Sequence, residues 1–280
     1  MRKIHTDVII SNIKEMCIEA NYHLSDDIEK AINRGTKEEK SILGKRILGQ
    51  LEENMLIAKE EEIPICQDTG MAIIFIKVGQ QVAIEGISLE DAINEGIRQG
   101  YKEGYLRKSV VLDPLIRENT KDNTPGIIHY EIVPGENIEI TVAPKGFGSE
   151  NMSRIYMLKP ADGIEGVKKA VLETVSLAGP NACPPIVVGV GIGGSFEKAA
   201  ILSKKALTRN IETSSSYEHI KILEDELLEE INKLGIGPGG FGGKITALGV
   251  NIEVYPTHIA ALPVAINICC HVNRHLSRII

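Results

Sequence analysis

Hydrophobic residues recur at helical spacing in the first part of the chain, from Val8 to Ile13 and again from Ile42 to Leu51. This period predicts α-helices that bury one apolar face. Thr36, followed three residues later by Glu39, is typical of a capping box and predicts that a helix begins there. The charged run 59–62 predicts the solvated end of this helical segment.

Strand patterns follow the helical segment. Met71–Gly79 is rich in β-branched and other apolar residues and is too short for a helix, so it predicts a buried strand. Ser88 and Asp91 predict the start of a helix. Residues 129–134 and 137–144 alternate in polarity and predict a pair of strands around a turn.

The second half of the chain also mixes strands and helices. Residues 184–207 predict a strand, a glycine turn and a helix, and residues 217–234 predict an acidic amphipathic helix. Two β-like stretches follow at 244–255 and 260–268. We expect the last residues, 271–280, to form a short helix.

The predicted fold class is mixed α/β. We expect a single domain, in which a helical N-terminal lobe (about 1–62) packs on an α/β lobe (about 63–280) with a mixed sheet. The 280 residues are 43% hydrophobic and 25% charged, which excludes a disordered chain and a disulfide-dense mini-domain.

Charge and composition narrow the partners and the compartment. A net charge of −7 and an aromatic content of 4% disfavour nucleic-acid binding. No segment reaches the roughly 20 apolar residues of a membrane span, and the start of the chain lacks a secretory signal pattern. We therefore expect a cytoplasmic protein with neither nucleic acid nor membrane as its partner.

Five scattered cysteines are the first candidates for chemistry: Cys17, Cys66, Cys183, Cys269 and Cys270. An odd number in a reducing compartment is no disulfide framework, so they are core thiols, metal ligands or nucleophiles. The absence of a CxxC pair disfavours a zinc ribbon. Three separated thiolates could hold an iron–sulfur cluster whose remaining iron is open to substrate as a Lewis acid.

The surroundings of these cysteines leave alternatives open. Cys66 lies in PICQDTG, where a thiol, an amide, a carboxylate and a hydroxyl follow one another just before a strand. This pattern fits the edge of a functional site and a simple polar turn equally well. Prolines on both sides make the Cys183 loop rigid. A rigid loop could present the thiol to a metal, but buried loop cysteines are also common. Cys269 and Cys270 face opposite sides of a strand, so we expect at most one to face a site.

The histidines give weaker signals. His271 and His275 have the helical spacing of a metal-binding pair, but no glutamate completes an HExxH motif, so an exposed pair on a terminal helix is favoured. His258 lies in a polar turn before a strand. A catalytic or substrate-binding role and a simple turn role explain it equally well.

Two glycine segments complete the candidates. Gly189, Gly191 and Gly194 satisfy GxGxxG after a strand and before a helix, which allows an NAD-dependent oxidoreductase as an alternative. The acidic second strand of that fold is poorly matched here, and the glycines also suit binding of another anion or close helix packing.

The second glycine segment is 145–150. Gly146 and Gly148 leave backbone amides exposed, Lys145 adds a positive charge, and we expect a helix to begin just after them. Amides and a cation before a helix suit a dicarboxylate ligand.

The motifs PICQDTG, KGFGSEN, GPNACPPIVVGVGIGG, GIGPGGFGG and the CCH near the end occur in this order in class I fumarate hydratases and in the related L(+)-tartrate dehydratase α subunits. The chain resembles this family over about residues 5–275. Five motifs in one order are much more specific than any single glycine pattern.

The resemblance implies an oxygen-sensitive 4Fe–4S hydro-lyase that reversibly dehydrates a 2-hydroxy dicarboxylate, malate to fumarate in the first place and tartrate as the alternative. It assigns the cluster ligands to Cys66, Cys183 and Cys270, the last because the family's ligand directly precedes a histidine. Asp68 and His258 take the catalytic positions. The implied substrate contacts are Gln67, Arg107, Lys145, Gly146 and Gly148.

The resemblance also implies a partner. Fused family members are much longer, whereas this chain ends at Ile280, soon after the last implied ligand. It therefore resembles the α subunit of a split enzyme that needs a separate β subunit, and we also consider an α–α homodimer. A non-catalytic binding module whose cysteines are core thiols is the remaining alternative.

Overall fold

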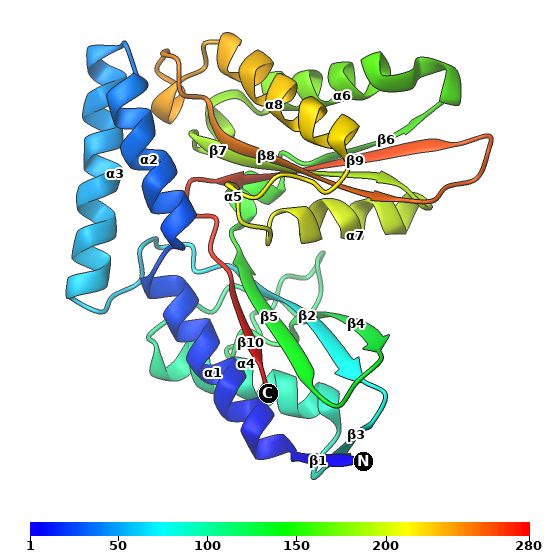
Figure 1. Ribbon diagram of the computed structural model, residues 1–280. Helices are drawn as coiled ribbons and strands as arrows, with labels where there is room; N and C mark the ends of the chain where they lie inside the picture. The colour runs from blue at the N-terminus through cyan, green and yellow to red at the C-terminus, as the bar shows by residue number, and fades with distance from the viewer. The chain divides into compact units, whose positions relative to one another are not determined.

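Figure 1 shows a computed structural model of the chain, which describes residues 1–280. The helices are α1 (Thr6–Tyr22), α2 (Asp26–Glu38), α3 (Ile42–Glu60), α4 (Leu89–Glu103), α5 (Phe147–Glu150), α6 (Gly163–Ala178), α7 (Phe196–Ala206) and α8 (Glu218–Lys233). The strands are β1 (Arg2–His5), β2 (Met71–Gly79), β3 (Val82–Glu85), β4 (Ile127–Val133), β5 (Ile138–Lys145), β6 (Arg154–Leu158), β7 (Ile186–Gly193), β8 (Ala247–Tyr255), β9 (Leu262–Cys270) and β10 (Leu276–Ile279). Three short 3₁₀ turns are η1 (Pro160–Asp162), η2 (Gly179–Ala182) and η3 (Pro238–Gly240). The predicted mixed α/β class is confirmed, because both four-stranded sheets combine parallel and antiparallel pairs.

Helices α1 and α3 lie where the hydrophobic spacing predicts them, and α2 lies between them in the sequence. The capping-box prediction is wrong. Thr36 lies inside α2, where its hydroxyl donates to the Ile32 carbonyl oxygen at 3.1 Å, and Glu39 follows the end of that helix. A threonine hydroxyl can bond back to the preceding turn, so this residue pair does not by itself mark a helix start. None of the helices combines the length and the apolar character needed to span a bilayer.

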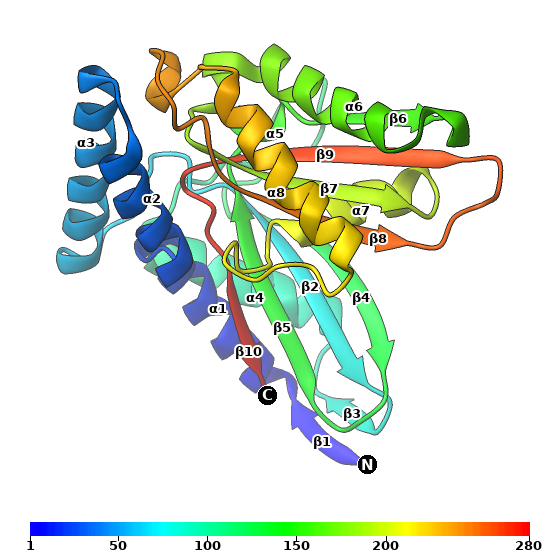
Figure 2. The ribbon, with the colours of Figure 1, turned by 45° about the horizontal axis from the view of Figure 1, so that its top comes forward.

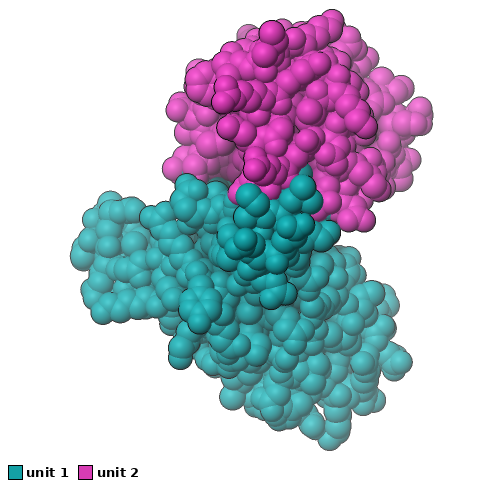
Figure 3. Space-filling model, turned by 90° about the vertical axis from the view of Figure 1, so that its left-hand side faces the viewer, with its two compact units in different colours: residues 1–25, 55–147, 274–280 teal, residues 26–54, 148–273 magenta.

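The chain forms two compact units, which Figure 3 colours separately. Unit 1 comprises Met1–Ser25, Met55–Phe147 and Arg274–Ile280, and unit 2 comprises Asp26–Asn54 and Gly148–Asn273. The helical residues at the N-terminus therefore contribute to both units, and the end of the chain returns to unit 1.

The sheet of unit 1 has the strand order β10-β5-β2-β4. β2 has the predicted bounds, and it pairs in parallel with β4 and antiparallel with β5. The prediction that 129–134 and 137–144 pair with each other is therefore wrong, since β2 lies between them. The reason lies in β2 itself. Ile73 and Ile74 face opposite sides and are both at most 3% exposed, and such a buried strand needs a neighbour at each edge for its backbone groups.

Helices α1 and α4 pack on each other and on this sheet. α4 begins as predicted, because the Ser88 hydroxyl accepts a hydrogen bond from the Asp91 amide at 3.1 Å. The shared core contains Ile9, Ile13 and Met16 of α1, Ile93, Ile97 and Tyr101 of α4, Ala72, Ile74 and Ile76 of β2, and Ile138, Ile140 and Val142 of β5. A separate small sheet pairs β1 with β3.

The end of the chain forms a strand, so the prediction of a terminal helix is wrong. β10 pairs antiparallel with β5, with Leu276 opposite Val142. Arg278 adds ion pairs with Glu15 and Glu19 of α1, at 2.7 and 2.8 Å. Pairing with a strand more than a hundred residues earlier in the sequence decides this conformation, and the local spacing of residues contains no sign of it.

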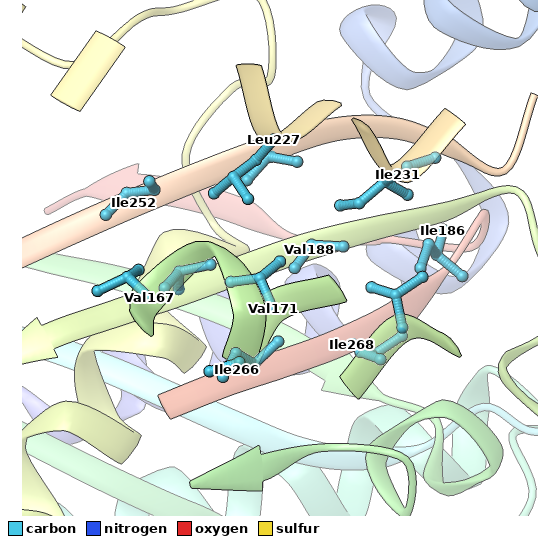
Figure 4. Close-up of a cluster of buried hydrophobic side chains, with 14 of the residues drawn as sticks. Val167, Val171, Ile186, Val188, Leu227, Ile231, Ile252, Ile266 and Ile268 are labelled. Atoms are coloured by element: carbon cyan, nitrogen blue, oxygen red, sulfur yellow. The ribbon is translucent and has the colours of Figure 1, made fainter. Parts of the chain in front are cut away.

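Unit 2 is built on a sheet of order β6-β9-β7-β8 (Figure 2). Figure 1 shows α6 and α8 on one face of this sheet and α7 on the other. Apolar side chains fill the first interface (Figure 4), including Val167 and Val171 of α6, Leu227 and Ile231 of α8, Ile186 and Val188 of β7, Ile252 of β8, and Ile266 and Ile268 of β9. The elements predicted at 184–207, 217–234, 244–255 and 260–268 are confirmed, whereas β6 was not anticipated.

Unit 2 also contains a buried carboxylate between the end of α2 and the segment that leads into β8. Glu39 is 1% exposed. Its Oε1 accepts hydrogen bonds from the amides of Lys40, Ser41 and Lys244, and its Oε2 accepts one from Ile245, at 2.7 to 3.0 Å. Burial by itself raises the pKa of Glu39, but the four backbone donors together hold that pKa below its ordinary value.

Candidate functional site

The loop Cys66–Gly70 leads into β2 and is fixed through Asp68. Oδ1 of Asp68 accepts a hydrogen bond from the Gly70 amide at 3.0 Å, and Oδ2 accepts one from the Phe147 amide at 2.9 Å. The first bond closes the loop on itself. The second joins it to the residues that follow β5. Both are charge-assisted bonds to a carboxylate, which are stronger than bonds between neutral groups.

Neighbouring residues hold the same loop by its backbone. The Tyr101 hydroxyl, fully buried, donates toward the carbonyl oxygens of Thr69 and Gly70, each 3.0 Å away. Burial raises the pKa of Tyr101, so the group stays a neutral donor. The Thr69 hydroxyl accepts from the Arg107 amide at 2.9 Å and donates to the Arg107 carbonyl oxygen at 3.3 Å. These bonds bring the backbone of Arg107 beside the loop, while the Arg107 side chain is exposed.

The end of β5 approaches this loop closely. Gly70 has φ +77°, and a Cβ there would lie 2.7 Å from the carbonyl carbon of Lys145, so only glycine fits. A Cβ at Gly146 would lie 3.2 Å from Oδ2 of Asp68. Lys145 is 4% exposed, and its Nζ donates to the Gly146 carbonyl oxygen at 3.2 Å. A buried lysine thus ends β5, directly before the residues that meet Asp68.

The helix expected after Lys145 is only the single turn α5, and the chain then continues into β6. That prediction was wrong, and so was the idea of a helix N-terminus for anion binding, because one turn has no appreciable dipole. A Cβ at Gly148 would meet no atom within 4 Å. Close packing therefore explains why residue 146 is a glycine, but it does not explain the glycine at position 148.

Two residues that hold the loop were missed in the sequence. Tyr101 lies within α4, and Arg274 lies just before β10. Arg274 is 3% exposed and donates to the carbonyl oxygens of Asp68 and Pro144. Neither residue belongs to a motif or to a local pattern, so only the folded chain reveals them.

Cys183 lies in unit 2 between η2 and β7 and is exposed. Its backbone is left-handed, with φ 54° and ψ 61°, and its amide donates to the Pro180 carbonyl oxygen at 3.0 Å. Residues with a side chain seldom adopt this conformation, and where they do, it often belongs to a functional site. The loop presents the thiol at the surface of unit 2.

Strand β9 ends with Cys269 and Cys270, which differ in burial as the alternation of a strand predicts. Cys269 is 3% exposed, and its Sγ lies 3.8 Å from the Val272 carbonyl oxygen. Cys270 is half-buried and is paired with Ile186 of β7. Because Ile186 follows Cys183 by three residues, the register brings the Cys183 loop and Cys270 to the same end of the sheet.

The five cysteines fall into two groups by accessibility. None forms a disulfide. Cys17 and Cys269 are buried, and burial raises the pKa of the Cys17 thiol to about 12. Cys66, Cys183 and Cys270 are exposed or half-buried. Since thiolates are the usual ligands of iron–sulfur clusters, these three residues fit the cluster that the resemblance implies.

His258 lies in the turn between β8 and β9 and is exposed. Its Nδ1 accepts a hydrogen bond from the Ala260 amide at 3.2 Å, so the neutral ring carries its proton on Nε2. The residue borders a groove of about 430 Å³ in unit 2, with His219, Ile164 and Ile259 among its walls. A mostly apolar groove with an outward imidazole could bind a small organic ligand.

Two other sequence patterns have structural explanations. Gly189 and Gly191 lie inside β7 rather than in a phosphate-binding turn, and a Cβ at either would lie 2.2 or 2.1 Å from a backbone oxygen of α7. They allow α7 to pack closely, whereas Gly194 lies in the following turn. His271 and His275 lie between β9 and β10, where the chain forms no helix. The prediction of a histidine pair on a terminal helix is therefore wrong.

The structure divides the candidate residues between the two units. Unit 1 brings together the segments that contain Cys66, Gln67, Asp68, Arg107, Lys145 and Gly146. Unit 2 contains Gly148, Cys183, His258 and Cys270. Neither unit by itself gathers three His, Cys, Asp or Glu side chains that could hold a metal ion.

Comparisons with known proteins agree with the resemblance. The family model described as fumarate hydratase (Fumerase) matches residues 10–278. The chain is 46% identical over 275 residues to a putative L(+)-tartrate dehydratase subunit alpha from Methanocaldococcus jannaschii, covering 96% of this chain and 95% of that protein. It is 35% identical over 270 residues to the L(+)-tartrate dehydratase subunit alpha of Escherichia coli strain UTI89, covering 95% and 88%. The chain belongs to the fumarate hydratase family, and its class of enzyme is hydro-lyase.

Proposed function

We propose that this chain is the α subunit of an iron–sulfur hydro-lyase that reversibly dehydrates a 2-hydroxy dicarboxylate, with malate and fumarate as the reacting pair. The accessibility of the thiols is the observation that carries the proposal. Cys66, Cys183 and Cys270 are the accessible three of five cysteines, whereas Cys17 and Cys269 are buried in the core.

In this proposal, Cys66, Cys183 and Cys270 hold a 4Fe–4S cluster. Such a cluster, when bound, supplies an open iron as the Lewis acid that assists a hydroxyl leaving group. The chain itself supplies the charges for the substrate. Arg107 and Lys145 bind carboxylate groups by charge-assisted hydrogen bonds.

The remaining contacts come from groups of the same loops. Gln67, whose Oε1 lies 3.3 Å from the Cys66 Sγ, offers an amide to the substrate. The backbone amides of Gly146 and Gly148 are further donors for a carboxylate. These neutral donors set the orientation of the ligand more than its affinity.

Asp68 and His258 take the proton-handling positions. Asp68 keeps an orientation fixed by two backbone amides, which suits a group that orients the substrate hydroxyl or takes part in proton transfer. His258 lies in the turn that precedes β9, whereas Cys270 ends that nine-residue strand, so the two residues lie at opposite ends of the unit 2 sheet. The proposed role of His258 in proton transfer therefore rests on the resemblance alone.

L(+)-tartrate is the second candidate substrate. The relatives that are 46% and 35% identical to the chain are named for this compound, which supports it directly. Tartrate and malate share the 2-hydroxy dicarboxylate skeleton and differ by one hydroxyl. A site built to bond that hydroxyl would reject the analogue that lacks it, so comparing kcat/KM for the two acids decides between them.

A separate β subunit completes the enzyme in this proposal. The relatives are named subunit alpha, which supports a split enzyme. We propose a heteromer in which two α chains can also associate. We place it in the cytoplasm, because accessible thiols need a reducing compartment. The cluster-loaded chain alone should have no dehydratase activity, and full activity of the isolated chain would contradict the split-enzyme proposal.

The first experiment is a count of iron and acid-labile sulfide after strictly anaerobic reconstitution. We expect about four of each per wild-type chain. Cys66→Ser, Cys183→Ser and Cys270→Ser should each lose them, while Cys17→Ala and Cys269→Ala serve as matched controls that retain them. Absence of iron in the wild type, or a loss confined to Cys269→Ala, would overturn the assignment.

A further inference from the structure

Arg274 is a buried cation without an acidic partner. It is 3% exposed, its Nε and Nη2 donate to backbone carbonyl oxygens, and its Nη1 has no hydrogen-bond partner. Burial of a charge that forms no direct ion pair is costly. We therefore relate the role of Arg274 to the two hydrogen bonds that it forms.

These two bonds join the two segments that meet at Asp68. Nε of Arg274 donates to the Pro144 carbonyl oxygen at 3.1 Å, and Nη2 donates to the Asp68 carbonyl oxygen. Pro144 lies in β5, three residues before Phe147. The Phe147 amide in turn donates to the carboxylate of Asp68. Asp68 is thus held to the β5 segment twice, by its backbone through Arg274 and by its side chain through Phe147.

The chemistry of this junction requires a guanidinium. The two carbonyl oxygens belong to different segments, and a planar group with donors in fixed, diverging directions can bond both at once. An ammonium on a flexible stem lacks that fixed geometry. A neutral side chain would remove the charge but would leave the buried Pro144 carbonyl oxygen and the half-buried Asp68 carbonyl oxygen without these donors, which is costly as well.

We propose that Arg274 is the positioning residue of Asp68, a role that rests on the proposed function of Asp68 in dehydration. Its guanidinium fixes the backbone of Asp68 against β5, so that the carboxylate faces the substrate in one orientation. Arg274 itself touches neither substrate nor cofactor. Without it, the loop moves relative to Lys145 and Gly146, and the reacting groups lose their alignment.

The test compares Arg274→Ala and Arg274→Lys with a matched control, Arg278→Ala. Arg278 lies four residues later and forms ion pairs with Glu15 and Glu19, away from Asp68. The first readout is amide hydrogen exchange of the full-length, cluster-free chain. For both Arg274 variants we expect the Gly70 and Phe147 amides to exchange about tenfold faster, while β2 and β9 keep their protection.

The second readout is the kinetics of the cluster-loaded complex with its partner subunit. Misplacement by about 1 Å can lower the rate a hundredfold, so we expect kcat of Arg274→Ala to fall about a hundredfold. We expect KM to change less than about threefold, since binding groups are retained. Added guanidinium ion should restore kcat of Arg274→Ala about tenfold, because it replaces the missing donors.

Three outcomes would overturn the proposal. One is unchanged exchange at Gly70 and Phe147. Another is full kcat in Arg274→Lys, which would show that charge alone suffices. A third is faster exchange throughout unit 1 without rescue by guanidinium, which would mean a purely structural role. If Arg274→Ala does not fold, Arg274→Lys carries the test. If the wild-type complex dehydrates no dicarboxylate, the proposed function fails, whereas the exchange experiment still tests whether Arg274 fixes the backbone of Asp68.

Discussion

Asp68 shows how one side chain can organise a site. Its two carboxylate oxygens accept hydrogen bonds from two different segments, at Gly70 and Phe147. Its carbonyl oxygen accepts a third bond from Arg274. A group fixed at three atoms has little rotational freedom left to lose when a ligand binds, and this kind of preorganisation favours catalysis.

We predict that Asp68→Asn lowers dehydratase turnover about a hundredfold, because the amide removes the charge and turns one oxygen into a donor. That NH₂ group would face a backbone N–H, and we expect a stability loss of about 1–3 kcal/mol in urea unfolding. Asp113→Asn is the matched control. Asp113 also accepts two amide hydrogen bonds, from Leu115 and Ile116, but on an exposed turn. Turnover of Asp68→Asn within twofold of the wild type would refute the assigned role.

At the scale of elements, Glu39 connects parts of unit 2 that are far apart in sequence. It follows α2 directly, yet two of its four amide donors, Lys244 and Ile245, come just before β8. The carboxylate thus does between elements what a capping residue does within a helix. Its lowered pKa makes this connection sensitive to pH.

We predict that Glu39→Gln destabilises unit 2 by about 1–3 kcal/mol at neutral pH, since an amide cannot accept all four hydrogen bonds. A carboxyl whose folded pKa is lowered stabilises the fold above its ordinary pKa of 4.5. That contribution is lost as the pH falls from this value through the folded pKa, so the difference between wild type and variant should shrink there. Urea unfolding at a series of pH values measures it.

The control for this prediction is Glu38→Gln. Glu38 forms an ion pair with Lys244 at 2.8 Å, and both side chains are nearly half exposed. Surface pairs contribute at most about 1 kcal/mol. A Glu38 variant as destabilised as the Glu39 variant would show that the buried amides are not the cause.

Local patterns predicted most of the individual elements but not their neighbours. β2, α4, β7, α7 and α8 follow from hydrophobic period and capping residues. The insertion of β2 between β4 and β5, and the strand at 276–279, depend on long-range pairing that no local window contains. The motif PICQDTG revealed the Asp68 loop, whereas Tyr101 and Arg274 carry no such signal, because they reach the loop only through folding.

At the scale of the whole molecule, unit 1 is assembled from three separate stretches of chain. The last stretch supplies β10 at the edge of the sheet, next to β5. Ile280 adds two backbone hydrogen bonds with Ile138, at 2.9 and 2.8 Å. The end of the chain is therefore a structural part of unit 1.

We predict that a chain ending at His275 loses stability in unit 1 alone. Removal of β10 leaves the β5 edge unpaired and breaks the ion pairs of Arg278, so amides of β5 and α1 should exchange at least about tenfold faster. The strands β7 and β9 of unit 2 should keep their protection. Ile279→Ser in the full-length chain is the control, because that side chain is 70% exposed and its backbone pairing remains. Equal loss of protection in both units would contradict the prediction.

The return of the chain end to unit 1 also sets an order of events on the ribosome. Unit 2 has all of its residues once Asn273 has been added, but unit 1 must wait for residues 274–280. Until then the nascent chain exposes an unpaired β5 edge, which is a template for aggregation. The Asp68 carbonyl also lacks its Arg274 donor during this time. The junction around Asp68 is therefore complete only after Arg274 has been added, so a nascent chain that stops before Arg274 lacks this donor.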